Sequence, residues 1–157
     1  MNLIKIHHKS QYVTFRLADN LIGINILDIR EIVPYIKITQ VQQTPAFVLG
    51  LINLRGQILT VLDIGVLLGL EKREAHSKSH IIIFKHKNVG FIVDQIGDVI
   101  GTDQKHMESI PANIDANIQK YMENIINLPD EILMILNAKK VLSYMQTKDE
   151  KTPKEYL

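Results

Sequence analysis

The sequence predicts an all-β protein built from two tandem small β-barrels, and three observations support this prediction. Apolar and polar residues alternate along several segments, which is the period of half-buried strands. The pattern occurs twice along the chain in the same order. Each half is short and consists mostly of predicted strands, so it can bury an apolar face only by curling up.

The composition favours a folded domain and gives little reason to expect a nucleic-acid or membrane partner. The chain has 157 residues, which we treat as a single domain, 1–157, and it is 46% hydrophobic and 22% charged. A net charge of +1 is too small to favour nucleic acid or anionic lipid. No apolar run reaches the roughly 18 residues of a membrane helix, and the first residues lack a signal-peptide core. We therefore expect a cytoplasmic protein without direct membrane insertion.

The first half begins with a strand over Tyr12–Leu17, where every second residue is apolar. Asp19 and Asn20 then supply turn residues, because both tolerate left-handed backbone. The alternation of apolar and polar residues resumes after the turn. The apolar residues then follow one another at spacings of three and four, and we expect the chain to bend there. The apolar residues of this second part are Ile22, Ile24, Ile26, Ile29, Ile32 and Val33.

The second half repeats this arrangement over His80–Gly101, and its segment Asn124–Tyr144 repeats the segment Gly50–Leu70 of the first half. The first block is offset by 67 residues, so that Gly23 matches Gly90, and the second by 74, so that Asn53 matches Asn127. The change of offset places a net insertion of seven residues between the two blocks of the second half. We predict a first barrel over 12–70, a second over 80–145 and a flexible tail over 146–157.

Each half is also predicted to close with a short helix. Asp63 and Asn137 occupy matching positions, and each precedes a short apolar run. Both residue types are good N-caps, because their side-chain oxygens accept bonds from the first backbone amides of a helix.

A single arginine stands out in the apolar stretch Gly50–Leu70. Arg55 corresponds to Pro129 in the second half, so the repeated fold does not require its guanidinium. One interpretation places Arg55 in water at a hairpin tip. The other makes it a recognition feature, oriented by Glu31 through a bidentate ion pair. We predict that Arg55 lies within hydrogen-bonding reach of Glu31 and is partly buried.

No catalytic, metal or cofactor site is evident in the sequence. The six histidines are scattered, and there is no cysteine, no glycine-rich phosphate loop and no nucleophile motif. Aromatic residues make up 6% of the chain and are not interleaved with basic ones, which argues against stacking on nucleic acid. A barrel that binds a small ligand or nucleic acid stays the alternative from a different functional class.

The segment Thr44–Ile64, with its Asn53-Leu54-Arg55-Gly56 tetrad, resembles the signature of the CheW family of bacterial chemotaxis coupling proteins. The segments "LIGINILDIREIV" and "VGFIVDQIGDVI" show the same resemblance, which extends from Tyr12 to Tyr144. It implies two five-stranded barrels of the SH3/OB-like kind and a non-enzymatic adaptor without cofactors.

The resemblance also implies the partners. These are the regulatory domain of a CheA-type histidine kinase and the cytoplasmic tips of methyl-accepting chemoreceptors. The protein would be a monomer when free and would join membrane-associated arrays through these partners. An adaptor of a parallel array, controlling type IV pili or gene expression, is the alternative within the family.

The predicted partner-binding residues come from both halves. We expect an apolar crevice beside the tetrad, able to take the helical hairpin of a receptor tip. One wall would hold Ile29 and Gly50, and the other Val89 and Gly90. The full predicted set is Ile29, Glu31, Gly50, Asn53, Arg55, Gly56, Val89 and Gly90.

Overall fold

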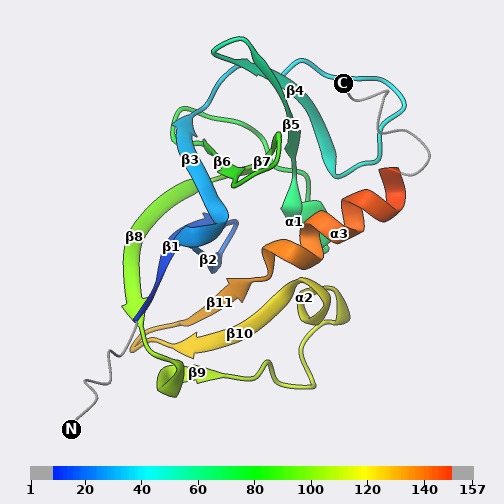
Figure 1. Cartoon of the computed structure of the whole chain (residues 1–157). Coiled ribbons are helices and arrows are strands. Elements are labelled where there is room, and N and C mark those ends of the chain that lie inside the picture. The colour runs from blue at the N-terminus through cyan, green and yellow to red at the C-terminus, as the bar shows by residue number, and fades with distance from the viewer. Residues whose placement is uncertain (1–8, 150–157) are drawn as a thin grey trace, which may run out of the picture.

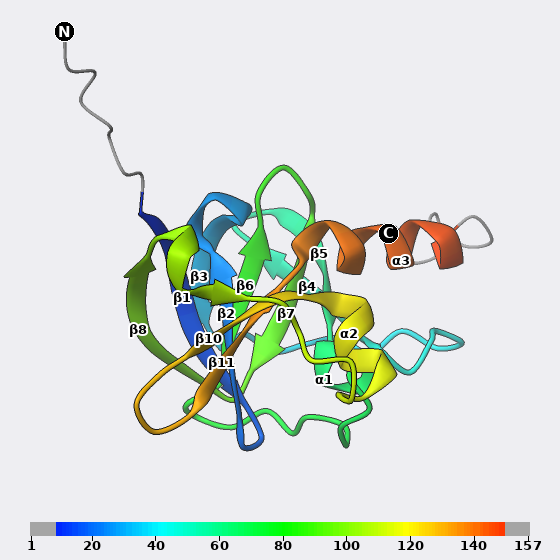
Figure 2. The same ribbon diagram turned by 90° about the horizontal axis from the view of Figure 1, so that it is seen from below.

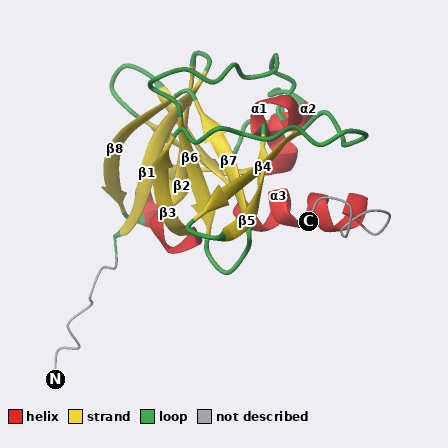
Figure 3. Ribbon diagram, turned by 90° about the horizontal axis from the view of Figure 1, so that it is seen from above, coloured by secondary structure: helices red, strands yellow, loops and turns green. Residues whose placement is uncertain are grey.

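The computed structural model describes residues 9–149, which form two β-sheets with short helices beside them (Figure 1). The prediction of an all-β protein is confirmed. The three α-helices gather on one side of the sheets, as Figures 2 and 3 show from opposite directions. Within residues 9–149, no helix is long and apolar enough to cross a membrane.

Sheet one has six strands, in the order β8-β1-β2-β11-β10-β9, and lies in the lower part of Figure 1. Its strands are β1 (Ser10–Leu17), β2 (Asn20–Asn25), β8 (Gln95–Thr102), β9 (Met107–Glu108), β10 (Met122–Asn127) and β11 (Ile132–Leu136). Sheet two has five strands, in the order β3-β6-β7-β5-β4. Its strands are β3 (Ile29–Pro34), β4 (Val48–Leu54), β5 (Gln57–Leu62), β6 (His80–Phe84) and β7 (Val89–Val93).

The two sheets are copies of one another, as the repeated sequence predicts. The sequence offsets match β1 with β6, β2 with β7, β3 with β8, β4 with β10, and β5 with β11. Replacing each strand of the series β8-β1-β2-β11-β10 by its equivalent reproduces the order of sheet two. The extra strand β9 pairs with Ile125, and its counterpart is an isolated bridge between Thr39 and the equivalent Leu51.

The structure corrects the expectation that 12–70 and 80–145 each form their own barrel. The hairpin β1–β2 of the first half joins β8, β10 and β11 of the second, and β6–β7 joins β3, β4 and β5. Each hairpin makes one antiparallel join, β1 with β8 or β6 with β3, and one parallel join, β2 with β11 or β7 with β5. The registers of the two parallel joins agree, because Gly23 lies opposite Ile135 as Gly90 lies opposite Val61. Each half thus completes the other's sheet.

The main hydrophobic core lies between the two sheets and joins them. Phe15 of β1 and Phe84 of β6 pack against Phe91 of β7, with ring centroids 5.4 and 5.2 Å apart respectively. All three side chains are buried. Each sheet also holds a smaller apolar cluster of its own, around Leu59 in sheet two and Leu133 in sheet one. Because strands of both halves line the main core, the two halves are expected to fold together.

The helices are α1 (Ile64–Leu67), α2 (Ala116–Tyr121) and α3 (Ala138–Asp149), and two 3₁₀ turns, η1 (Ile26–Asp28) and η2 (Gln104–His106), connect strands. Asn137 caps α3 as predicted, with its Oδ1 accepting from the Lys140 amide at 3.1 Å. Helix α3 continues to Asp149, so residues 146–149 are helical rather than part of a flexible tail. The rest of the predicted tail, 150–157, lies outside the described residues.

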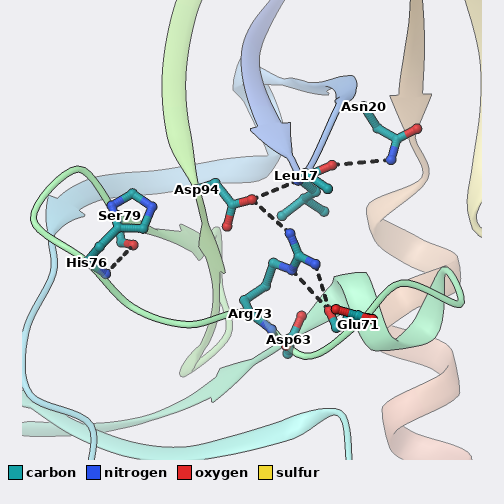
Figure 4. Close-up of polar contacts among 9 residues, drawn as sticks. Leu17, Asn20, Asp63, Glu71, Arg73, His76, Ser79 and Asp94 are labelled. Atoms are coloured by element: carbon teal, nitrogen blue, oxygen red, sulfur yellow. Dashed lines mark hydrogen bonds and ion pairs between the residues drawn. The ribbon is translucent and has the colours of Figure 1, made fainter.

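Asp63 stands at the start of α1 but does not cap it, contrary to the prediction. Its Oδ2 instead accepts a hydrogen bond of 2.6 Å from the backbone amide of Arg73 (Figure 4). The Arg73 guanidinium donates to Asp94 at 2.8 Å, and Asp94 also accepts from the Ala18 amide at 2.7 Å. This network fastens the segment between the two halves to the β1–β2 turn.

The Asp63 carboxylate has too few hydrogen bonds to offset the cost of its burial. Asp63 is fully buried, and its Oδ1 has no hydrogen-bond partner within the described part of the chain. Burial raises the pKa of Asp63 above its ordinary value of 3.8, and the hydrogen bond from the Arg73 amide offsets this only in part. The folded state therefore binds this proton more tightly than the unfolded state does.

We predict that Asp63→Asn removes a pH-dependent destabilisation. The contribution of Asp63 is most favourable below pH 3.8 and is lost as the pH rises through its raised folded-state pKa. The variant should be at least as stable as the wild type at pH 7, because the amide keeps the Arg73 bond without a buried charge. Urea unfolding from pH 4 to 8 measures this.

Asp63→Ala serves as the control for that experiment. It leaves the partly buried Arg73 amide without its acceptor and should cost about 1–3 kcal/mol at pH 7. A loss of stability in Asp63→Asn as large as in Asp63→Ala would contradict the interpretation.

Candidate functional site

The tetrad Asn53–Gly56 forms the turn of the β4–β5 hairpin. Leu54 pairs with Gln57, and the two residues between them have positive φ angles, 51° at Arg55 and 82° at Gly56. This is the pattern of a two-residue type I′ turn, whose twist suits a hairpin. The Asn53 Oδ1 accepts from the Gly56 amide at 3.0 Å. The tetrad therefore builds a fixed tip with Arg55 at its outermost point.

Arg55 forms the predicted ion pair with Glu31, through one hydrogen bond rather than the two of a bidentate pair. Its Nη2 lies 2.5 Å from the Glu31 Oε1, and the exposed fractions of the two side chains are 68% and 28%. The predicted contact is confirmed, whereas the predicted partial burial of Arg55 is wrong. The reason is the turn, since a residue at the tip of a tight hairpin projects away from the sheet into solvent.

The Arg55–Glu31 contact also shows that sheet two curls. Glu31 belongs to β3 at one edge of the sheet, and Arg55 follows β4 at the other edge, with three strands between them. Farther along, Thr39 and Leu51 exchange two backbone hydrogen bonds of 2.8 Å and join the same two edges. The curl brings together, at one end of sheet two, residues from strands that are far apart in its strand order.

Arg30 is the important residue that the sequence did not single out. Its Nη1 donates to the Gln57 Oε1 at 3.2 Å, and its Nη2 donates to the Lys87 carbonyl and, at 3.3 Å, to the Asn88 Oδ1. The Gln57 Nε2 donates to the same Asn88 oxygen at 3.0 Å. Arg30 thus ties β3 to the β4–β5 hairpin and to the β6–β7 turn.

We call the residues of this end of sheet two the hairpin surface. They share the contacts described above and come from both halves of the chain. The hairpin surface consists of Arg30, Glu31, Asn53, Arg55, Gly56, Gln57, Lys87 and Asn88.

The predicted crevice walled by Gly50 and Gly90 is not supported. Both glycines are buried. A Cβ atom at Gly50, where φ is 148°, would lie 2.1 Å from the Thr39 carbonyl oxygen, and one at Gly90 would lie 2.8 Å from that of Ile82. Glycine at these two positions allows neighbouring backbone segments of sheet two to pack closely. Ile29 and Val89 are half-buried and pack against the main core.

The matching end of sheet one differs in its side chains. The positions equivalent to Glu31, Arg55 and Gln57 hold Asp98, Pro129 and Glu131. Glu131 instead receives two hydrogen bonds from Arg16, of 2.7 and 2.6 Å, which lower the pKa of Glu131 from its ordinary value. A depression of about 470 Å³ lies beside this pair, between β8 and the β10–β11 loop.

Neither end has the residues of a metal centre. Within residues 9–149, no three histidine, aspartate or glutamate side chains gather closely enough to hold an ion. The hairpin surface consists of exposed and half-buried polar groups held by hydrogen bonds, an arrangement suited to contact with another protein.

Comparison with known proteins agrees with a protein-interaction domain. A family model described as the CheW-like domain matches residues 11–146. The chain is 29% identical to the chemotaxis protein CheW of Bacillus subtilis over 83% of this chain and 85% of that protein. It is 28% identical to CheW of Helicobacter pylori over 84% and 81% of the two chains.

A solved structure shows the same fold. The crystal structure of the scaffolding protein TtCheW from Thermoanaerobacter tengcongensis superposes with a TM-score of 0.75 and 32% identity, covering 88% of this chain and 90% of that one. The duplicated two-sheet fold is therefore that of a chemotaxis scaffold protein. The chain belongs to the CheW family.

We predict that Arg55 contributes little to stability. An exposed ion pair is worth under about 1 kcal/mol, and asparagine tolerates left-handed backbone better than arginine does. Arg55→Asn should therefore change the free energy of unfolding by less than about 1 kcal/mol. A double-mutant cycle with Glu31→Ala, followed by urea unfolding, measures the coupling of the pair. A coupling energy well above that limit would mean that the ion pair is shielded from solvent.

Proposed function

We propose that this protein is a chemotaxis adaptor that couples a CheA-type histidine kinase to the cytoplasmic tips of methyl-accepting chemoreceptors. The family and the scaffold fold support this function. In this proposal the protein has no catalytic activity of its own. It acts in the cytoplasm as a monomer until its partners recruit it to the array.

We further propose that the hairpin surface is the receptor contact, with the kinase's regulatory domain on another face. The supporting observation is that the two copies of the fold carry different side chains at their hairpin ends. Both sheets have the same strand order, yet only sheet two carries Arg55 and Glu31 at its hairpin end. Since the copy in sheet one forms without this pair, the fold does not account for it.

The crevice that the sequence suggested is replaced in this proposal by an exposed tip. Gly50 and Gly90 act from within sheet two, where they let neighbouring backbone approach closely. Glu31, Asn53, Arg55 and Gly56 keep their proposed role in partner binding.

Reconstitution of kinase signalling tests the function. Adding the protein to a purified CheA-type kinase and receptor-bearing membranes should raise the rate of kinase phosphorylation. Arg55→Asn should reduce this stimulation several-fold while the protein still binds the kinase alone. Pro129→Asn, which places the same residue at the equivalent tip of sheet one, is the matched control and should stimulate normally.

Two outcomes would count against the proposal. No stimulation by the wild-type protein, with kinase and receptors both shown to be active, would refute the adaptor function. Full stimulation by Arg55→Asn together with loss in Pro129→Asn would move the receptor contact to sheet one.

A further inference from the structure

Arg30 is held in one place by neutral oxygen atoms. Its guanidinium donates to the Gln57 side chain, the Lys87 carbonyl and the Asn88 side chain, which lie on two different loops of sheet two. These bonds use three of the five N–H donors of an arginine. The side chain is therefore already ordered, and binding an anion there would cost little further rotamer entropy.

No carboxylate balances the charge of Arg30 within residues 9–149. The other three arginines of the chain each pair with one, at 2.6 Å for Arg16, 2.5 Å for Arg55 and 2.8 Å for Arg73. Arg30 alone is held only by neutral acceptors. A guanidinium fixed in this way keeps its full attraction for an incoming carboxylate.

The second copy of the fold has no arginine at the position equivalent to Arg30. The position equivalent to Arg30 is Gly97, where a Cβ atom would lie 2.5 Å from the Thr14 Oγ1. The position equivalent to Gln57 is Glu131, which is already paired with Arg16. An arginine at the Arg30 position is therefore not required to build this end of a sheet.

We propose that Arg30 binds a carboxylate of the partner protein and that the hairpin surface recognises an acidic patch on it. Lys87, on an exposed turn, adds a second cation to the same surface. Arg55 is 68% exposed on the same surface, but its charge is paired with Glu31. This inference rests on the proposed function, because it takes the partner at this surface to be the chemoreceptor tip.

The decisive variant is Gln57→Glu. It supplies Arg30 with a carboxylate from within the chain, at a position 3.2 Å away, and copies the residue found in the second half. The fold should be as stable as before or more so. Affinity for the partner should fall about tenfold, the effect of losing one charge-assisted hydrogen bond.

The experiment uses the full-length chain and a soluble cytoplasmic fragment of a chemoreceptor from the same organism. Calorimetric titration at 50, 150 and 300 mM NaCl should show binding that weakens as salt rises, and the dependence should be smaller in Gln57→Glu and in Arg30→Gln. Arg30→Lys should keep part of the affinity. Arg16→Gln, which removes an arginine from the other sheet, should bind like the wild type.

The outcomes separate this inference from the proposed function. If the wild-type chain binds the receptor fragment and Gln57→Glu binds equally well with the same salt dependence, Arg30 is structural and the inference is refuted. If the wild-type chain binds neither the receptor fragment nor the kinase, the proposed function itself fails.

Discussion

Four strand pairings between the two halves hold this protein together: β1 with β8 and β3 with β6 are antiparallel, and β2 with β11 and β5 with β7 are parallel. Each pairing joins a hairpin of one half to strands of the other half. The pairing of β5 with β7 places the β6–β7 turn beside the start of β5, where the Thr60 amide donates to the Asn88 carbonyl at 3.0 Å. Asn88 of the second half can then contact Gln57 and Arg30 of the first. Without the exchange of hairpins, the hairpin surface would not exist.

The duplication provides an internal comparison between what the fold needs and what it does not. Many apolar positions, the buried pair Gly23 and Gly90, and the registers of the two parallel strand pairings agree in the two copies. The two hairpin ends share a carboxylate, Glu31 or Asp98, but sheet two carries Arg30 and Arg55 where sheet one has Gly97 and Pro129. Features present in both copies are explained by packing. The features that differ are therefore the ones to examine for a role in partner binding.

Much of the fold was predictable from local pattern, and one contact of the site was too. The alternation at Tyr12–Leu17 and its repeat gave the strands, and the tetrad gave the hairpin. The contact between Arg55 and Glu31 was predicted because one carboxylate lies near one unmatched arginine. The exchange of hairpins was not predictable, because alternation shows that a segment is a strand but not which strand it pairs with.

The wrong predictions at the site have the same cause, because local sequence pattern does not show which distant parts of the chain come into contact. Gly50 looked available for docking, but residues of a distant segment cover it, with Thr39 filling the space that a Cβ atom would take. Arg30 lies at a shift of register between β3 and β6, from Ile29 to Glu31, which the periodicity does not reveal. Its acceptors come from loops 27 and more residues away in the sequence. An unmatched charge next to a predicted site residue was the only available signal.

We propose that one end of sheet two, and not its copy in sheet one, contacts the receptor. Backbone amide chemical shifts of isotope-labelled protein, recorded as the receptor's cytoplasmic fragment is added, test this contact. We expect the largest shifts at 30–31, 53–57 and 87–88, with little change at 97–98 and 128–131. Shifts centred on the second set of residues would contradict it.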